Sequence, residues 1–88
     1  GLDGYAIEVP LTDYMLLVRN DDVPGCIGRV GTYLGDTGHN ISDMVVGRSP
    51  EGAAAMMGIA LDGPIPPDHL DGLLSLDGVN AARYIDLS

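Results

Sequence analysis

The 88-residue sequence contains no phenylalanine, no tryptophan and no lysine. Hydrophobic residues still make up 45% of the chain, so its core must be built from aliphatic side chains and methionine. The chain has four basic and 13 acidic residues, which gives a formal net charge of -9 at pH 7. A chain this acidic is poorly suited to neutralise phosphates, so we do not expect nucleic acid as a partner.

Disulfides and membrane spans are also missing from the sequence. Cys26 is the single cysteine, and it cannot form an internal disulfide. Gly, Pro or Asp interrupts every apolar run, so none approaches the roughly 20 residues needed to cross a bilayer. No charged segment with an apolar stretch after it resembles a signal peptide. We therefore expect one small domain in the cytoplasm, with no membrane partner.

The spacing of apolar residues predicts six elements in the order strand, helix, strand, strand, helix, strand. Their expected ranges are Tyr14 to Asn20, Pro24 to about Asp36, Asn40 to Arg48, Ala53 to Asp62, a helix that begins at Pro67, and Val79 to Leu87. A turn over residues 49–52 is expected to join the two middle strands. This order predicts an α+β fold of the ferredoxin-like βαββαβ type, a four-stranded antiparallel sheet with both helices on one face.

Particular residues set the details of these elements. Pro24 suits the first turn of the first helix, and Gly38 stands where a left-handed C-terminal cap is wanted. Leu17 is expected in the core of the first strand. The apolar stripe of the first helix consists of Ile27, Val30, Gly31 and Leu34.

The second strand is expected at an edge of the sheet and is apolar on both faces. Its alternation places Ile41, Val45 and Gly47 on one face and Ser42, Met44 and Val46 on the other. An edge strand with apolar residues on both sides can pair with another strand. We therefore expect a homodimer formed by edge-strand pairing.

A polar loop follows the first strand and leads into the first helix. A helix start presents unpaired backbone N–H groups and the positive end of the helix dipole, and Asp22 adds a carboxylate beside them. This combination suits a zwitterion, with its carboxylate on the amides and its ammonium group on the acid. The sequence thus indicates a site for a small-molecule effector.

Two motifs in this order of elements resemble the ACT domain, a regulatory module that binds amino acids. They are Asp22-Val23-Pro24-Gly25-Cys26-Ile27-Gly28-Arg29-Val30 and Gly38-His39-Asn40-Ile41. The resemblance covers about residues 13–88. Asp3-Gly4-Tyr5 before the module and the ending Ala82-Arg83-Tyr84-Ile85-Asp86-Leu87 are also similar to the C-terminal region of the long form of the D-3-phosphoglycerate dehydrogenases. This similarity implies that residues 1–12 are the tail of a preceding, intervening domain. It also implies that this fragment is not itself an enzyme and that NAD belongs to other domains of the parent enzyme.

The resemblance also implies a site for a small amino acid, L-serine above all, between two ACT domains. One chain would supply the loop residues Asn20, Asp22, Val23, Pro24 and Gly25, and the other would supply Asn40 and Ile41. Asn20 departs from the His or Tyr that the family carries at its position. This departure bears on selectivity for serine, because that side chain would help to read the hydroxyl group.

Other interpretations stay open for these residues. Asp22 can simply cap the first helix, and Asn40 can be a turn residue. The whole chain can be a dimerisation module without ligand binding, or the ACT domain of another enzyme of amino-acid metabolism. An acylphosphatase-like hydrolase is disfavoured, because no arginine lies between Asn20 and Gly28.

Metal and nucleotide sites are not expected. His39 and His69 lack the spacing of metal ligands. Gly25, Gly28 and Gly31 match neither the dinucleotide-binding fingerprint nor a P-loop. Cys26 has no His or second Cys near it in the sequence, so no catalytic residue is predicted.

Overall fold

The computed structural model describes residues 12–48 and 54–88. The expected tail of a preceding domain and the turn at 49–52 therefore lie outside the described residues, except for Thr12. The elements are β1 (Tyr14–Asp21), α1 (Cys26–Asp36), β2 (Ile41–Arg48), β3 (Ala54–Leu61), α2 (Pro67–Leu74) and β4 (Val79–Asp86). Their order confirms the predicted βαββαβ arrangement.

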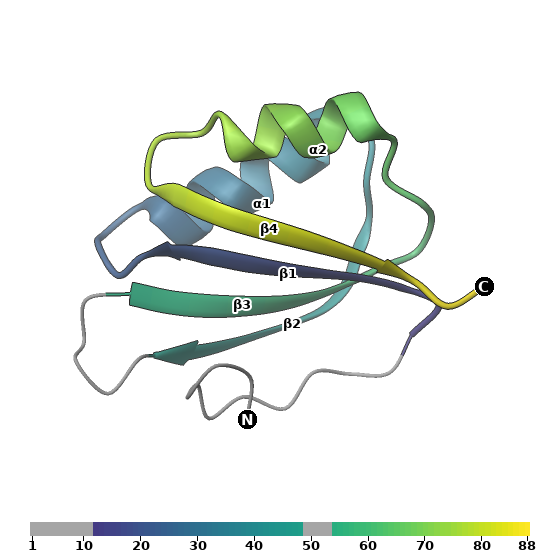
Figure 1. The fold of residues 1–88 in the computed structure, drawn as a ribbon, viewed down its shortest axis with the longest axis horizontal. Helices are drawn as coiled ribbons and strands as arrows, with labels where there is room; N and C mark the ends of the chain where they lie inside the picture. Colours follow the sequence, from purple (N-terminus) through teal and green to yellow (C-terminus); the bar gives the residue numbers. More distant parts are fainter. Residues whose placement is uncertain (1–11, 49–53) are drawn as a thin grey trace.

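The four strands form one sheet in the order β2-β3-β1-β4, and all neighbouring pairs are antiparallel. Both helices lie on the same side of this sheet (Figure 1). The ferredoxin-like fold is thus confirmed, with β2 at one edge and β4 at the other. Neither described helix is long and apolar enough to cross a membrane.

The core lies between the sheet and the two helices. Leu16 and Val18 of β1 face the helices, and both are completely buried. They pack in one cluster with Met57, Ile59, Val30, Leu34 and Leu73, among others. Leu17 was expected in this core, but it is only half-buried. The reason is the alternation of a strand, which turns Leu17 to the side away from the helices.

A register shift in β2 overturns one detail of the expected faces. Ile41 pairs with Leu61 and Val45 pairs with Gly58, with the shift between Ile41 and Asp43. An extra residue in one strand reverses the alternation beyond it. Ile41 therefore lies on the helix side of the sheet with Met44, whereas Val45 lies on the opposite side. The prediction that Ile41 and Val45 share a face is wrong.

The first helix begins two residues later than expected, at Cys26. Gly25 is its N-cap and has φ 87°, a left-handed conformation that favours glycine. Pro24 instead lies in a short turn in which Cys26 N–H donates to Val23 O at 3.4 Å. At the other end, Gly38 has φ 89°, as predicted. Pro67 occupies the first turn of α2, also as predicted.

Candidate functional site

Asn20 is the one buried polar residue in the described core, with 1% of its surface exposed. It follows Leu16 and Val18 on the helix-facing side of β1, where the strand reaches the loop to α1. Its Nδ2 donates to the carbonyl oxygen of Asp21 at 3.0 Å. Its Oδ1 is buried and has no hydrogen-bond partner among the residues that the structure describes. Leaving such an acceptor unpaired typically costs about 1–3 kcal/mol, so this oxygen is suited to a donor from outside the chain.

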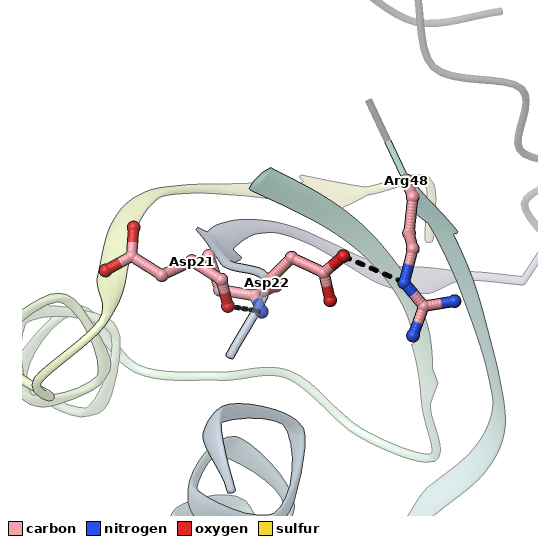
Figure 2. A network of polar contacts seen from close by, with 4 residues as sticks. Asp21, Asp22 and Arg48 are labelled. Atoms are coloured by element: carbon pink, nitrogen blue, oxygen red, sulfur yellow. Dashed lines mark hydrogen bonds and ion pairs between the residues drawn. The ribbon is translucent and has the colours of Figure 1, made fainter. Parts of the chain in front are cut away.

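Asp22 lies next to the end of β2 and forms an ion pair there. Arg48 Nε donates to Asp22 Oδ2 at 2.9 Å (Figure 2). The carboxylate of Asp21 points the opposite way in this view and accepts a hydrogen bond from Asn80 Nδ2 at 3.0 Å. The two neighbouring acids thus belong to different surroundings, and only Asp22 faces the β2 edge.

The first turn of α1 offers backbone donors to this region. Arg29 N–H begins the helical ladder by donating to Gly25 O at 2.9 Å. Within the described residues, the N–H groups of Ile27 and Gly28 have no acceptor. No side chain caps the helix, so the interpretation of Asp22 as a helix cap is wrong. Free amides at a helix start attract an anionic group.

Asn40 and Ile41 lie at the other end of the sheet. Because β1 and β2 are both antiparallel to β3, they run in the same direction. Asn40 precedes β2, whereas Asp22 follows β1, so the two side chains are about 25 Å apart along the strands. Asn40 Nδ2 donates to Asp62 Oδ2, and Asn40 O accepts from Asp62 N–H at 3.1 Å. One chain therefore does not bring Asn40 together with the loop of residues 20–25.

A pair of histidines ties the start of β2 to α2. His39 Nε2 and His69 Nδ1 are 2.9 Å apart, and the rings meet edge to face. Burial lowers the pKa of His39, and the charge of His69 lowers it further. Among the described residues, no group of three or more His, Cys, Asp or Glu could hold a metal ion.

Two of these contacts were missed in the sequence analysis. Arg48 lies 26 residues from Asp22 in the chain, and no motif spacing connects them. The register of the sheet connects them. Arg48 pairs with Ala55, and Ala55 pairs on its other side with Asn20, two residues before Asp22. The pair of His39 and His69 likewise forms only once α2 packs beside the end of α1. The only signal in the sequence was the predicted order of strands, which places the ends of β1 and β2 at the same end of the sheet.

Comparison with curated proteins identifies relatives for almost the whole chain. It is 36% identical over 86 residues to D-3-phosphoglycerate dehydrogenase of Synechocystis sp., and 35% identical over 88 residues to the Archaeoglobus fulgidus enzyme of the same name. Both matches cover 98% of the chain. The chain spans only 16% and 17% of the length of these two relatives. No protein-family model matches it.

Solved structures settle the fold of this matching region. The ACT domain of GTP pyrophosphokinase from Chlorobium tepidum superposes with a TM-score of 0.59, over 82% of this chain and 95% of that one, at 14% identity. The chain is similar to one region of the D-3-phosphoglycerate dehydrogenases, and this region has the fold of an ACT domain. A homoserine dehydrogenase from Thiobacillus denitrificans contains a similar fold, with a TM-score of 0.59 and 20% identity over 85% of this ACT domain and 17% of that chain. The resemblance stated from the two motifs is therefore confirmed.

Proposed function

We propose that this ACT domain binds a small amino acid, L-serine, and that it regulates a parent D-3-phosphoglycerate dehydrogenase. The observation that carries the proposal is the buried Oδ1 of Asn20, which has no partner in the described residues. A ligand hydroxyl or ammonium group would supply the missing donor. The family carries His or Tyr at this position, and Asn20 keeps a polar group there.

Charges around Asn20 match the two ends of an amino acid. The carboxylate of Asp22 would receive the ammonium group, since hydrogen bonds between ionised groups are the stronger ones. The free amides on the first turn of α1 would attract the carboxylate. Val23, Pro24 and Gly25 form the turn that holds these amides next to Asp22, and Val23 is 52% exposed.

A second copy would complete the site. Met44 and Val46 at the β2 edge are 38% and 39% exposed, which is high for large apolar side chains. If two β2 strands pair antiparallel about a two-fold axis, the start of each lies beside the end of the other. Asn40 and Ile41 of the second copy would then approach Asp22 of the first. The separation of these residues in one chain is what such a shared site requires.

Regulation would follow from linkage between binding and pairing. An effector that bridges two ACT domains favours the paired state, and coupling of this kind is typically about 1–3 kcal/mol. The dehydrogenase activity and its cofactor NAD would belong to other domains of the parent, because Gly25, Gly28 and Gly31 lack the dinucleotide-binding spacing. A cytoplasmic location fits the proposal, since Cys26 is free and buried.

Calorimetry on the purified chain tests the proposal, with L-serine as ligand and glycine and L-valine as comparators. We expect saturable binding of L-serine in preference to L-valine. Asp22→Ala should weaken that binding by about tenfold or more, the usual loss for a charge-assisted hydrogen bond. Asp36→Ala removes the same charge at the far end of α1 and should leave the affinity unchanged. Equal affinity in Asp22→Ala would remove Asp22 from the site.

One observation favours a second candidate function, a dimerisation module without a ligand. The carboxylate of Asp22 already has a cationic partner in Arg48, so it does not need a ligand to be neutralised. On this alternative, sedimentation should give a dimer whose fraction does not change with any amino acid. If calorimetry gives no heat of binding with any of the three amino acids, the chain is a dimerisation module without a ligand.

A further inference from the structure

Arg48 ends β2 and reaches across to the loop that follows β1. It uses only Nε to contact Asp22, and its two terminal nitrogens point away from that carboxylate (Figure 2). Within the described residues these two nitrogens have no hydrogen-bond partner, and the side chain is 64% exposed. Among the described residues, the guanidinium group is therefore held at Nε alone.

Stability gives little reason for this arrangement. An exposed ion pair typically contributes only about 0–1 kcal/mol. The chain has four basic residues in total, and Arg48 is the one that pairs with Asp22. Without a cation there, a carboxylate ligand would meet like charge at this end of the sheet.

We propose that Arg48 binds the carboxylate of the effector through its two terminal nitrogens. The planar guanidinium matches a carboxylate with two parallel hydrogen bonds. Asp22 orients Arg48 through Oδ2, and a carboxylate has further acceptor sites for the ammonium group of the ligand. The inference rests on the proposed function and deepens it, because it adds to the amides of α1 a cationic group for the ligand carboxylate, on a residue outside the two ACT motifs.

This pair of charges defines the class of ligand. Asp22 and Arg48 present a negative and a positive group in direct contact. An α-amino acid carries its ammonium and carboxylate groups on one carbon, so the two groups of the ligand are also close enough to meet this pair. An amine without a carboxylate would meet the free positive end of Arg48 and bind less well. The site should therefore require a free α-carboxylate.

Calorimetry with two ligands and three variants tests the role of Arg48. The ligands are L-serine and L-serine methyl ester, in which the carboxylate is blocked and the ammonium group is kept. Arg48→Gln removes both the positive charge and the planar guanidinium group, whereas Arg48→Lys keeps the positive charge alone. Arg83→Gln is the matched control, because Arg83 is exposed on β4 at the opposite edge of the sheet. Thermal unfolding of each variant checks that it is folded.

We expect Arg48→Gln to weaken L-serine binding by about tenfold or more, with a smaller loss in Arg48→Lys. Arg83→Gln should bind as the wild type does. The methyl ester should bind Arg48→Gln as tightly as the wild type or more tightly, because Asp22 is then released. Unchanged or tighter binding of L-serine to Arg48→Gln would overturn the inference, and so would an equal loss for both ligands. If the wild type binds no amino acid, the proposed function itself fails and this role of Arg48 fails with it.

Discussion

The role proposed for Asn20 would separate stability from function at a single position. A side chain that follows Leu16 and Val18 into the core would stabilise the fold best if it were apolar. Asn20 instead buries a carbonyl oxygen that nothing in the described chain satisfies. Such an exception to the rule that buried polar groups are paired is typical of a functional site.

Replacement of Asn20 by leucine, which has a similar shape, should therefore affect stability and binding in opposite directions. We expect Asn20→Leu to keep or raise the free energy of unfolding, because it removes a buried oxygen whose unmet hydrogen bond costs about 1–3 kcal/mol. Binding of L-serine should disappear. Urea denaturation followed by circular dichroism measures the first effect, and calorimetry measures the second.

A loss of stability greater than about 2 kcal/mol in Asn20→Leu would contradict this view. It would mean that the hydrogen bond from Asn20 Nδ2 to Asp21 O is a structural contact of the loop. Asn20→Asp serves as a second variant, because it keeps the shape and the acceptor but adds a charge. Its folding should be weaker than that of the wild type, since a buried unpaired carboxylate is costly.

At the scale of elements, two neighbouring residues of β1 lie on opposite faces of the sheet. Leu16 is completely buried against the helices, whereas Leu17 is half-buried on the other side. We expect Leu16→Ala to cost about 2–5 kcal/mol of unfolding free energy, the usual range for a cavity in a core. Leu17→Ala should cost about 1 kcal/mol, because less apolar area leaves the water there. Denaturant unfolding of both variants under the same conditions checks the difference, and equal losses would contradict the assignment of faces.

Apolar periodicity predicted all six elements, because burial of one face of each helix and strand depends on spacing within that element. It could not predict the bulge after Ile41, since a register shift depends on the partner strand. The start of α1 was placed at Pro24 rather than Cys26, because proline is favoured in the first turn of a helix. Gly25 has φ 87°, which is not helical, so the helix can begin only after it. This backbone angle is visible in the structure and not in the sequence.

The candidate site was predictable in part for the same reason. Asn20 and Asp22 follow directly from the end of a strand and the start of a helix, which are local signals. Arg48 was missed, because its contact with Asp22 depends on the alignment of β2, β3 and β1. Contacts across a sheet join residues far apart in sequence, and no local spacing marks them.

At the scale of the whole molecule, we expect the contact between His39 and His69 to make the fold sensitive to acid. Burial and the neighbouring ring lower the pKa of His39 below 6.5, its ordinary value. The neutral form is thus favoured in the folded chain, so this contribution to stability is complete above about pH 6.5. As the pH falls below that value, the unfolded chain takes up the proton first and stability is lost until the folded pKa is passed.

Thermal unfolding between about pH 7.5 and 5 measures this effect above the range in which carboxylates titrate. The unfolding temperature of the wild type should fall more steeply over this interval than that of His39→Gln, which cannot be protonated. His69→Gln is the matched variant, because it removes the partner ring and leaves His39 in place. It should also reduce the slope, since the charge of His69 is one of the two causes that lower the pKa of His39. Parallel profiles for the wild type and His39→Gln would show that the pair does not respond to acid.

In the proposed pairing, the β2 edge would determine whether two molecules associate. Val46 is 39% exposed on the helix side of this edge strand, beside Met44. A charge placed there would have to be buried on pairing, so Val46→Glu should make the chain monomeric in sedimentation experiments. Leu74→Glu is the control, because Leu74 is 41% exposed on α2, away from the edge, and adds the same charge. Pairing of chains with a charge of -9 each should also strengthen with added salt, which screens their repulsion.

Binding of L-serine should weaken together with pairing in Val46→Glu, although Asn20, Asp22 and Arg48 are unchanged. The reason is that one chain holds Asp22 and Asn40 at opposite ends of the sheet, so only a second copy can bring Asn40 to the loop. A monomeric variant with wild-type affinity would contradict a shared site and would confine the ligand to the loop and Arg48 of one chain. Loss of both dimer and binding in Val46→Glu, with neither lost in Leu74→Glu, is the outcome that a site built from two chains requires.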